Sequence, residues 1–326
     1  MPTRDDLKRR LLGVLSVSGG ITVGQLAKEL GTKPHVVRYQ MQQLIDSNTI
    51  RRTVLVNPWA LGLQAFNIFF DLPPRNAKAA IEFLKGRPEV LWLARNGGPR
   101  RYEVTLIAED FRGIREILEA LGEDVGVHVE RPVFSVEGEM CHWGLRFLLE
   151  ATNTPPLVRF AIPKEPVKLD ELDRQLVWYF NQVSEATVNN ATRVVHAAQS
   201  TIQYRLKRLK DEQVISDDVF FPTLQQGFVQ AQLVLNMLSR SKENQARIFR
   251  FCQDEKNVQS LICGVGSWDF KLIVDGDSIG DILTVQDRLN FEFSKIIAGS
   301  SLYIRDEILL STPGFAKPHN VHRRSI

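Results

Sequence analysis

The sequence predicts an α+β protein made of two copies of one unit, each a winged helix-turn-helix domain followed by a ferredoxin-like βαββαβ domain. The first observation is an internal repeat: when the sequence is shifted by 165 residues, 5–70 aligns with 170–235 without a gap. The second is a change of apolar spacing within each copy, from the helical period to short strand-like runs. Because the repeat gives both copies the same element order, it decides the fold class.

Identical residues mark the repeat, among them the pair Thr22 and Thr187. Further along, 98–102 corresponds to 266–270 at a shift of 168, so the register slips in the second part of the unit. Four prolines between 151 and 167 predict an extended linker. The predicted boundaries are a winged helix over 1–60, a ferredoxin-like domain over 61–150, the linker over 151–167, a second winged helix over 168–225, a second ferredoxin-like domain over 226–315 and a basic tail over 316–326.

The composition is that of an ordinary globular protein, with 44% hydrophobic and 24% charged residues. No apolar run approaches the length of about 18 residues that a membrane-spanning helix needs, and the charged first ten residues do not resemble a secretory signal. We therefore expect a cytoplasmic protein without a membrane partner. The three cysteines are widely spaced, which argues against a disulfide framework and against a metal site.

The first part of each copy has the pattern of three short helices. Leu7, Leu11 and Leu15 share one face of the first predicted helix. Thr22 can cap a second helix, and Gly31 can end it. The third helix is predicted over about 33–46, and the β-rich stretch 50–56 after it predicts a small hairpin or wing.

A helix-turn-helix places its third helix in the major groove of double-stranded DNA. The two copies should contact DNA unequally, because 1–55 carries nine basic and four acidic residues whereas 168–220 carries seven and eight. Three-helix units also serve as dimerisation or docking modules, and that alternative stays open. The candidate DNA-binding residues are Lys33, His35, Arg38, Tyr39, Gln42, Arg51 and Arg52 in the first copy, and Ser200, Gln203, Tyr204, Arg205, Lys207 and Arg208 in the second.

The second part of each copy has the order β-α-β-β-α-β of a split βαβ unit. Helices cover one face of such a sheet and the other face needs a partner, so we expect pairing through that face within or between chains, and a homo-oligomer. The predicted elements are 64–71, 77–85, 90–95, 101–108, 111–121 and 127–136 in the first copy, and 230–237, 243–252, 258–263, 268–275, 279–291 and 301–310 in the second.

At several places the residues resemble those of the Lrp/AsnC, or feast/famine, transcriptional regulators. Segment 169–176 resembles the acidic opening of the family's first helix, and 200–209 resembles its recognition helix. Gly266-Ser-Trp-Asp269-Phe270 resembles the Gly-x-x-Asp-aromatic hairpin of its sensing domain. The resemblance covers nearly the whole chain, twice. It implies a sequence-specific DNA-binding regulator that assembles through its sensing domains and binds a small effector such as an amino acid.

Carried over to this chain, the resemblance places the effector-binding site at Gly264, Gly266 and Asp269, and at Gly98 and Arg101 in the first copy. The two copies depart from the family pattern differently. The mid-helix arginine is kept as Arg205 in the second copy, whereas the first copy has Gln40. The glycines can equally be ordinary hairpin turns.

Two alternatives to a regulator share this architecture. One is a fused siroheme decarboxylase-like enzyme, which would need His and Arg residues around a tetrapyrrole, but a His-x-Tyr pattern is not found after the second strand. The other is a scaffold of the same fold that does not bind DNA. No nucleotide-binding, zinc-protease or serine-hydrolase motif is present. We therefore expect neither catalytic residues nor a cofactor.

Overall fold

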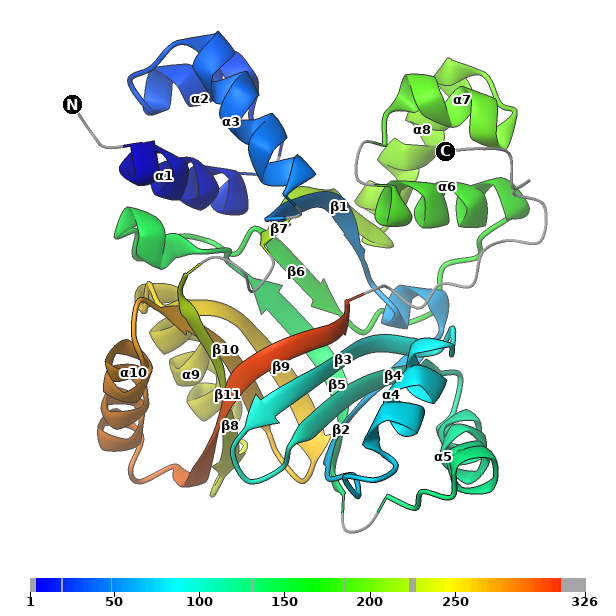
Figure 1. The fold of residues 1–326 in the computed structure, drawn as a ribbon, viewed down its shortest axis with the longest axis vertical. Helices are drawn as coiled ribbons and strands as arrows, with labels where there is room; N and C mark the ends of the chain where they lie inside the picture. The colour runs from blue at the N-terminus through cyan, green and yellow to red at the C-terminus, as the bar shows by residue number, and fades with distance from the viewer. Residues whose placement is uncertain are drawn as a thin grey trace.

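Two three-helix units lie on the same side of a large β-structure whose outer surface carries four helices (Figure 1). None of the described helices combines the length and the hydrophobicity that a membrane crossing needs. The tail, predicted over 316–326, lies outside the described residues. The computed structural model describes residues 4–18, 20–47, 49–129, 132–183, 186–222 and 227–311.

The first unit contains α1 (Arg4–Val17), α2 (Val23–Glu29) and α3 (Pro34–Asp46). The Thr22 hydroxyl accepts a hydrogen bond from the Gln25 amide at 3.3 Å, while the Gln25 side chain accepts one from the Thr22 amide at 3.0 Å. This capping box satisfies amide groups that a helix start leaves without partners, and it confirms the predicted cap. The apolar faces of the three helices share one core.

The second half begins with the same order of three helices: α6 (Glu171–Gln182), α7 (Val188–Val195) and α8 (Gln199–Asp211). Asp170 and Asp173 form a capping box at the start of α6. Thr187 accepts a hydrogen bond from the Asn190 amide at 3.1 Å and caps α7, as its counterpart caps α2.

The stretch 50–56, predicted as a small hairpin or wing, does not form a local hairpin. Strand β1 (Ile50–Val56) pairs with β7 (Ile215–Pro222), so the two stretches form one antiparallel ribbon that joins the halves of the chain. The backbone of each strand finds its hydrogen-bond partners in the other half, which removes the need for a second local strand.

The remaining strands form a closed barrel. Nine strands follow the order β2-β4-β3-β11-β8-β10-β9-β5-β6, and a further pairing between β2 and β5 closes a ring that leaves β6 outside. The strands are β2 (Gln64–Phe70), β3 (Val90–Gly97), β4 (Tyr102–Ala108), β5 (Val133–His142), β6 (Val158–Ala161), β8 (Val229–Met237), β9 (Val258–Gly266), β10 (Phe270–Gly276) and β11 (Ile297–Ser311).

Each half contributes a four-stranded sheet in the predicted β-α-β-β-α-β order, and the sheet face that was expected to need a partner meets the other half of the same chain. The helices pack on the outer faces, where they form two separate apolar cores (Figure 1). These helices are α4 (Ala77–Lys85) and α5 (Phe111–Val125) in the first half, and α9 (Lys242–Asp254) and α10 (Ile279–Glu292) in the second.

The short 3₁₀ helices η1 (Trp59–Leu61) and η2 (Arg146–Leu149) lie where each domain of the first half ends. The Arg146 guanidinium is buried and donates to the carbonyl groups of Gln253 at 2.6 Å and Cys252 at 2.7 Å, at the end of α9. Further bonds reach Glu255 and Val258, both at 2.9 Å. Since η2 also packs against α1, it joins the first helix-turn-helix unit to the second half.

Part of the predicted extended linker belongs to the β-sheet. Within it, β6 pairs with β5 and adds an edge strand to the barrel.

Beside this pairing, at the end of β5, His142 is buried, and its Nδ1 lies 2.8 Å from the Ser260 hydroxyl. Burial and the nearby charge of Arg146 lower the pKa of His142 to about 4.

We predict that stability falls as the pH drops through the range between 6.5 and about 4. Unfolded His142 takes up a proton near its ordinary value of 6.5, whereas the folded side chain stays neutral until about 4, so the stabilisation is complete above 6.5 and lost as the pH falls. The free energy of unfolding should fall by on the order of 3 kcal/mol across this range. Denaturant titrations at several pH values check this, and His142→Asn should flatten the dependence in that window. An equally steep dependence in the variant would contradict the assignment.

Candidate functional site

The exposed face of α3 is one candidate site. Lys33, His35, Arg38, Tyr39 and Gln42 are all exposed, as their spacing predicted, while the opposite side of α3 is buried. Within the described ranges, no carboxylate forms an ion pair with Lys33 or Arg38. The face therefore presents cations that an anionic partner can reach.

The corresponding face of α8 is different because acidic residues engage its basic side chains. Arg205 lies 2.7 Å from a carboxylate oxygen of Asp170, and Arg208 lies 2.9 Å from one of Asp173, which is fully buried. Further along the helix, Lys207 pairs with Asp211 at 2.5 Å, and Lys210 with Asp217 at 2.8 Å. Ser200, Gln203 and Tyr204 are exposed as predicted.

Arg51 and Arg52 lie in the β1–β7 ribbon rather than on a free wing. Arg52 forms a 2.6 Å ion pair with Asp218 of β7. Arg51 donates to the Asn181 carbonyl at 3.3 Å, and burial lowers its pKa. Both guanidinium groups thus have partners inside the protein, which weakens the case for phosphate contacts by these residues.

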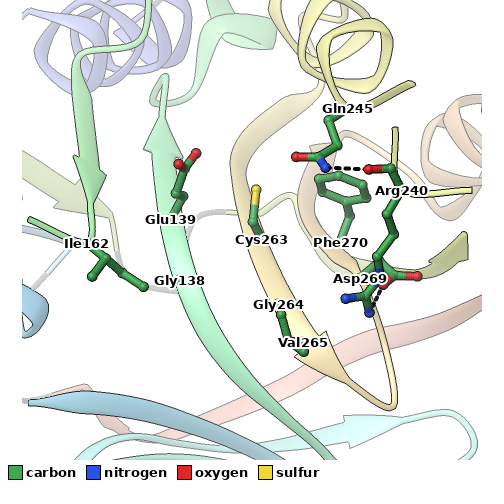
Figure 2. A pocket seen from close by; sticks show the side chains of 10 residues that line it. All are labelled: Gly138, Glu139, Ile162, Arg240, Gln245, Cys263, Gly264, Val265, Asp269 and Phe270. Carbon is green, nitrogen blue, oxygen red and sulfur yellow. Dashed lines mark hydrogen bonds and ion pairs between the residues drawn. The ribbon is translucent and has the colours of Figure 1, made fainter. Parts of the chain in front are cut away.

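A second candidate site is a pocket of about 260 Å³ on the outer side of the barrel, where β5 of the first half meets β9 of the second (Figure 2). Both halves and the linker contribute side chains, so the pocket exists only when the barrel is closed. Its lining residues are Gly138, Glu139, Ile162, Arg240, Gln245, Cys263, Gly264, Val265, Asp269 and Phe270.

The polar groups of the pocket are arranged around an ion pair between Arg240 and Asp269. Asp269 also accepts a hydrogen bond from the Met237 amide at 2.6 Å, and Gln245 donates to the Arg240 carbonyl at 2.8 Å. Figure 2 shows Glu139 across the pocket from this group, with Cys263 between them. Burial raises the pKa of Cys263 to about 12, so the thiol is neutral at physiological pH and a poor nucleophile.

Of the five predicted effector residues, Gly264 and Asp269 line this pocket. Gly98 and Gly266 have φ values of 141° and 145°, which favour glycine. A Cβ atom would lie 2.7 Å from the Leu302 carbonyl oxygen at Gly98, and 2.5 Å from that of Phe134 at Gly266. These two glycines therefore permit the close contact of one half with the other.

Arg101, the remaining predicted effector residue, is exposed, and its amide donates to Asp71 at 2.9 Å. Sequence patterns did not reveal Arg240, Gln245 or Glu139, because none belongs to a recognisable motif and they meet only through the pairing of β5 with β9.

Comparisons with known proteins support the first helix-turn-helix unit. Residues 4–51 match the family model for winged helix-turn-helix DNA-binding domains. No curated protein matches the sequence.

Among solved structures, the siroheme decarboxylase NirDL is similar over 94% of this chain and 93% of that chain, with a TM-score of 0.60 and 12% identity. Its complex with an iron-uroporphyrin III analogue gives a TM-score of 0.59 at the same identity and coverage. The Mycobacterium tuberculosis leucine response regulatory protein is 23% identical, with a TM-score of 0.35 over 40% of this chain and 90% of that chain. At 12% identity, the full-length similarity shows a shared α+β fold.

Proposed function

We propose that the chain is a DNA-binding transcriptional regulator, rather than an enzyme, and that the first helix-turn-helix unit reads the DNA. The observation that carries the proposal is the exposed, cationic face of α3 within the segment that matches a DNA-binding family model. Lysine and arginine on such a helix bind phosphate oxygens, while arginine and glutamine can also contact base edges in the major groove.

The second three-helix unit contributes less to this binding. Its basic residues on α8 are neutralised by Asp170, Asp173, Asp211 and Asp217, so each would have to leave a partner before it could reach a phosphate group. A DNA complex that depends on α3 alone is therefore favoured over one with two equivalent reading helices.

We predict that Lys33→Ala/Arg38→Ala weakens DNA binding about tenfold or more and reduces the salt slope by up to about two, because up to two phosphate contacts are lost. Fluorescence anisotropy with DNA from the protein's own upstream region, measured at several salt concentrations, checks this. Lys207→Ala/Lys210→Ala is the matched control, since it removes two cations from α8, and it should change affinity less than about threefold. Equal losses in both variants would refute the assignment of a single reading helix.

We further propose that the pocket between β5 and β9 binds a small zwitterion such as an amino acid. Arg240 offers a cation to a carboxylate group, and Asp269 and Glu139 offer anions to an ammonium group. A zwitterion can replace the contact between Arg240 and Asp269 without leaving either charge unpaired. A volume of about 260 Å³ suits a ligand of this size.

We predict that at least one of the common amino acids raises the thermal unfolding midpoint of the protein, because a ligand that binds only the folded state stabilises it. Arg240→Gln should abolish that shift, whereas Arg250→Gln, at an exposed position of α9 outside the pocket lining, should retain it. A shift that survives Arg240→Gln would place the ligand elsewhere.

The second candidate function is a siroheme decarboxylase-like enzyme, and the full-length similarity to NirDL favours it. The residues that line the pocket do not fit this enzyme function. Its lining includes no histidine, its one arginine is paired, and Glu139 and Asp269 would repel the carboxylates of a siroheme-like tetrapyrrole. A saturable shift of the absorbance band of an iron tetrapyrrole on addition of protein would support the enzyme. A protein that binds neither DNA nor tetrapyrrole would be a scaffold.

A further inference from the structure

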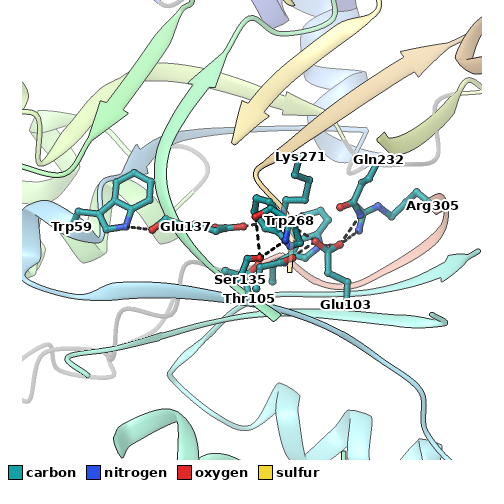
Figure 3. A network of polar contacts seen from close by, with 11 residues as sticks. Trp59, Glu103, Thr105, Ser135, Glu137, Gln232, Trp268, Lys271 and Arg305 are labelled. Carbon is teal, nitrogen blue, oxygen red and sulfur yellow. Dashed lines mark hydrogen bonds and ion pairs between the residues drawn. The ribbon is translucent and has the colours of Figure 1, made fainter. Parts of the chain in front are cut away.

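Four side chains form a network of ion pairs inside the barrel and are referred to here as the lumen charges: Glu103, Glu137, Lys271 and Arg305 (Figure 3). The Lys271 ammonium lies 3.0 Å from Glu103 and 2.8 Å from Glu137, and Arg305 donates to Glu103 at 3.0 Å. None of the four residues exposes more than 9% of its surface. They are thus paired with one another and shielded from water.

The lumen charges occupy corresponding positions in the two halves of the chain. Glu103 and Lys271 differ by 168 in residue number, as do Glu137 and Arg305, which is the shift that relates the two hairpins. At both pairs of positions the first half has an acid where the second half has a base. The inner sheet face of the first half therefore carries two negative lumen charges, and that of the second half carries two positive ones.

Neighbouring polar groups hold this arrangement in place. Glu103 accepts hydrogen bonds from Asn67 at 2.9 Å and from Gln232 at 2.6 Å. Burial alone would raise the pKa of Glu103, but Lys271 and Arg305 outweigh it and lower the pKa to about 2. The carboxylate is therefore ionised across the physiological range, and its charge is available to select a partner.

Pairing of two like halves would be energetically unfavourable, because it would bury charges of the same sign next to one another. Two first halves would bring four carboxylates together in a dry interior, and two second halves would bring four cations together. The second half also buries Asp275 on β10, but burial raises the pKa of this acid to about 7, so two copies of it would not neutralise four cations. Buried charges are tolerated only when they are paired, so neither assembly could form without protonation changes or water entry. Opposite halves pair all four lumen charges with one another.

We propose that the lumen charges select the partner of each sheet face, so that a first half pairs with a second half and not with another first half. The partner that each face fits is the complementary half, normally that of the same chain. This selection acts on the assembly of the barrel and does not depend on DNA binding.

Two full-length variants test this selection. Glu103→Lys/Glu137→Lys makes all four lumen charges positive, and Lys271→Glu/Arg305→Glu makes all four negative. Each variant expressed alone should be insoluble or have an unfolding midpoint lowered by more than about 10 °C. The matched control Glu82→Lys/Glu119→Lys reverses two exposed charges of the same half, on α4 and α5, and should shift the midpoint by less than about 3 °C.

Co-expression of the two lumen variants with different affinity tags decides the question even if neither folds alone. The proposal expects a soluble one-to-one complex through both tags, because each half of one chain then finds an opposite half on the other. Wild-type chains with the same tags set the level of background capture. The proposal is overturned if either variant alone keeps the wild-type midpoint, or if co-expression recovers no complex above that background.

Discussion

The rest of the structure depends on the pairing of two oppositely charged sheet faces inside the barrel. Glu103 lies at the centre of this pairing, since Lys271 and Arg305 of the second half both bind it. Barrel closure brings β5 next to β9 and thereby creates the pocket. Together with the β1–β7 ribbon, it also holds both three-helix units on one side of the molecule (Figure 1).

The sequence predicted what local chemistry determines. The three-helix order, the cap at Thr22 and the β-α-β-β-α-β order follow from spacing and turn residues, and the structure contains all of them. The ribbon between β1 and β7 was not predicted, and 50–56 was expected to form a small hairpin or wing. Its paired residues are more than 150 positions apart, and a strand pattern does not indicate which strand it pairs with. The role of Arg146 was also not foreseen, since its acceptors are backbone carbonyl groups that belong to no motif.

The sequence predicts some residues of the candidate sites and not others, for similar reasons. The exposed face of α3 follows directly from helical periodicity. The ion pairs that neutralise Arg205 and Arg208 depend on the position of α6 against α8, which the sequence does not reveal. At the pocket, the hairpin resemblance identified Gly264 and Asp269, while Glu139 comes from the other half of the chain. Charge counts had indicated that the two helix-turn-helix units would contact DNA unequally. The ion pairs that engage the basic residues of α8 give that inequality a physical basis.

Selection of binding sequences from a random DNA pool tests the central claim most directly, because it needs no knowledge of the natural target. A regulator with one reading helix should enrich a single, non-palindromic site, and Lys33→Ala/Arg38→Ala should abolish the enrichment. Enrichment of a palindrome with half-sites about one helical turn apart, by a protein that is monomeric in solution, would show two equivalent reading helices in one chain. No enrichment at low salt would contradict a sequence-specific DNA-binding function.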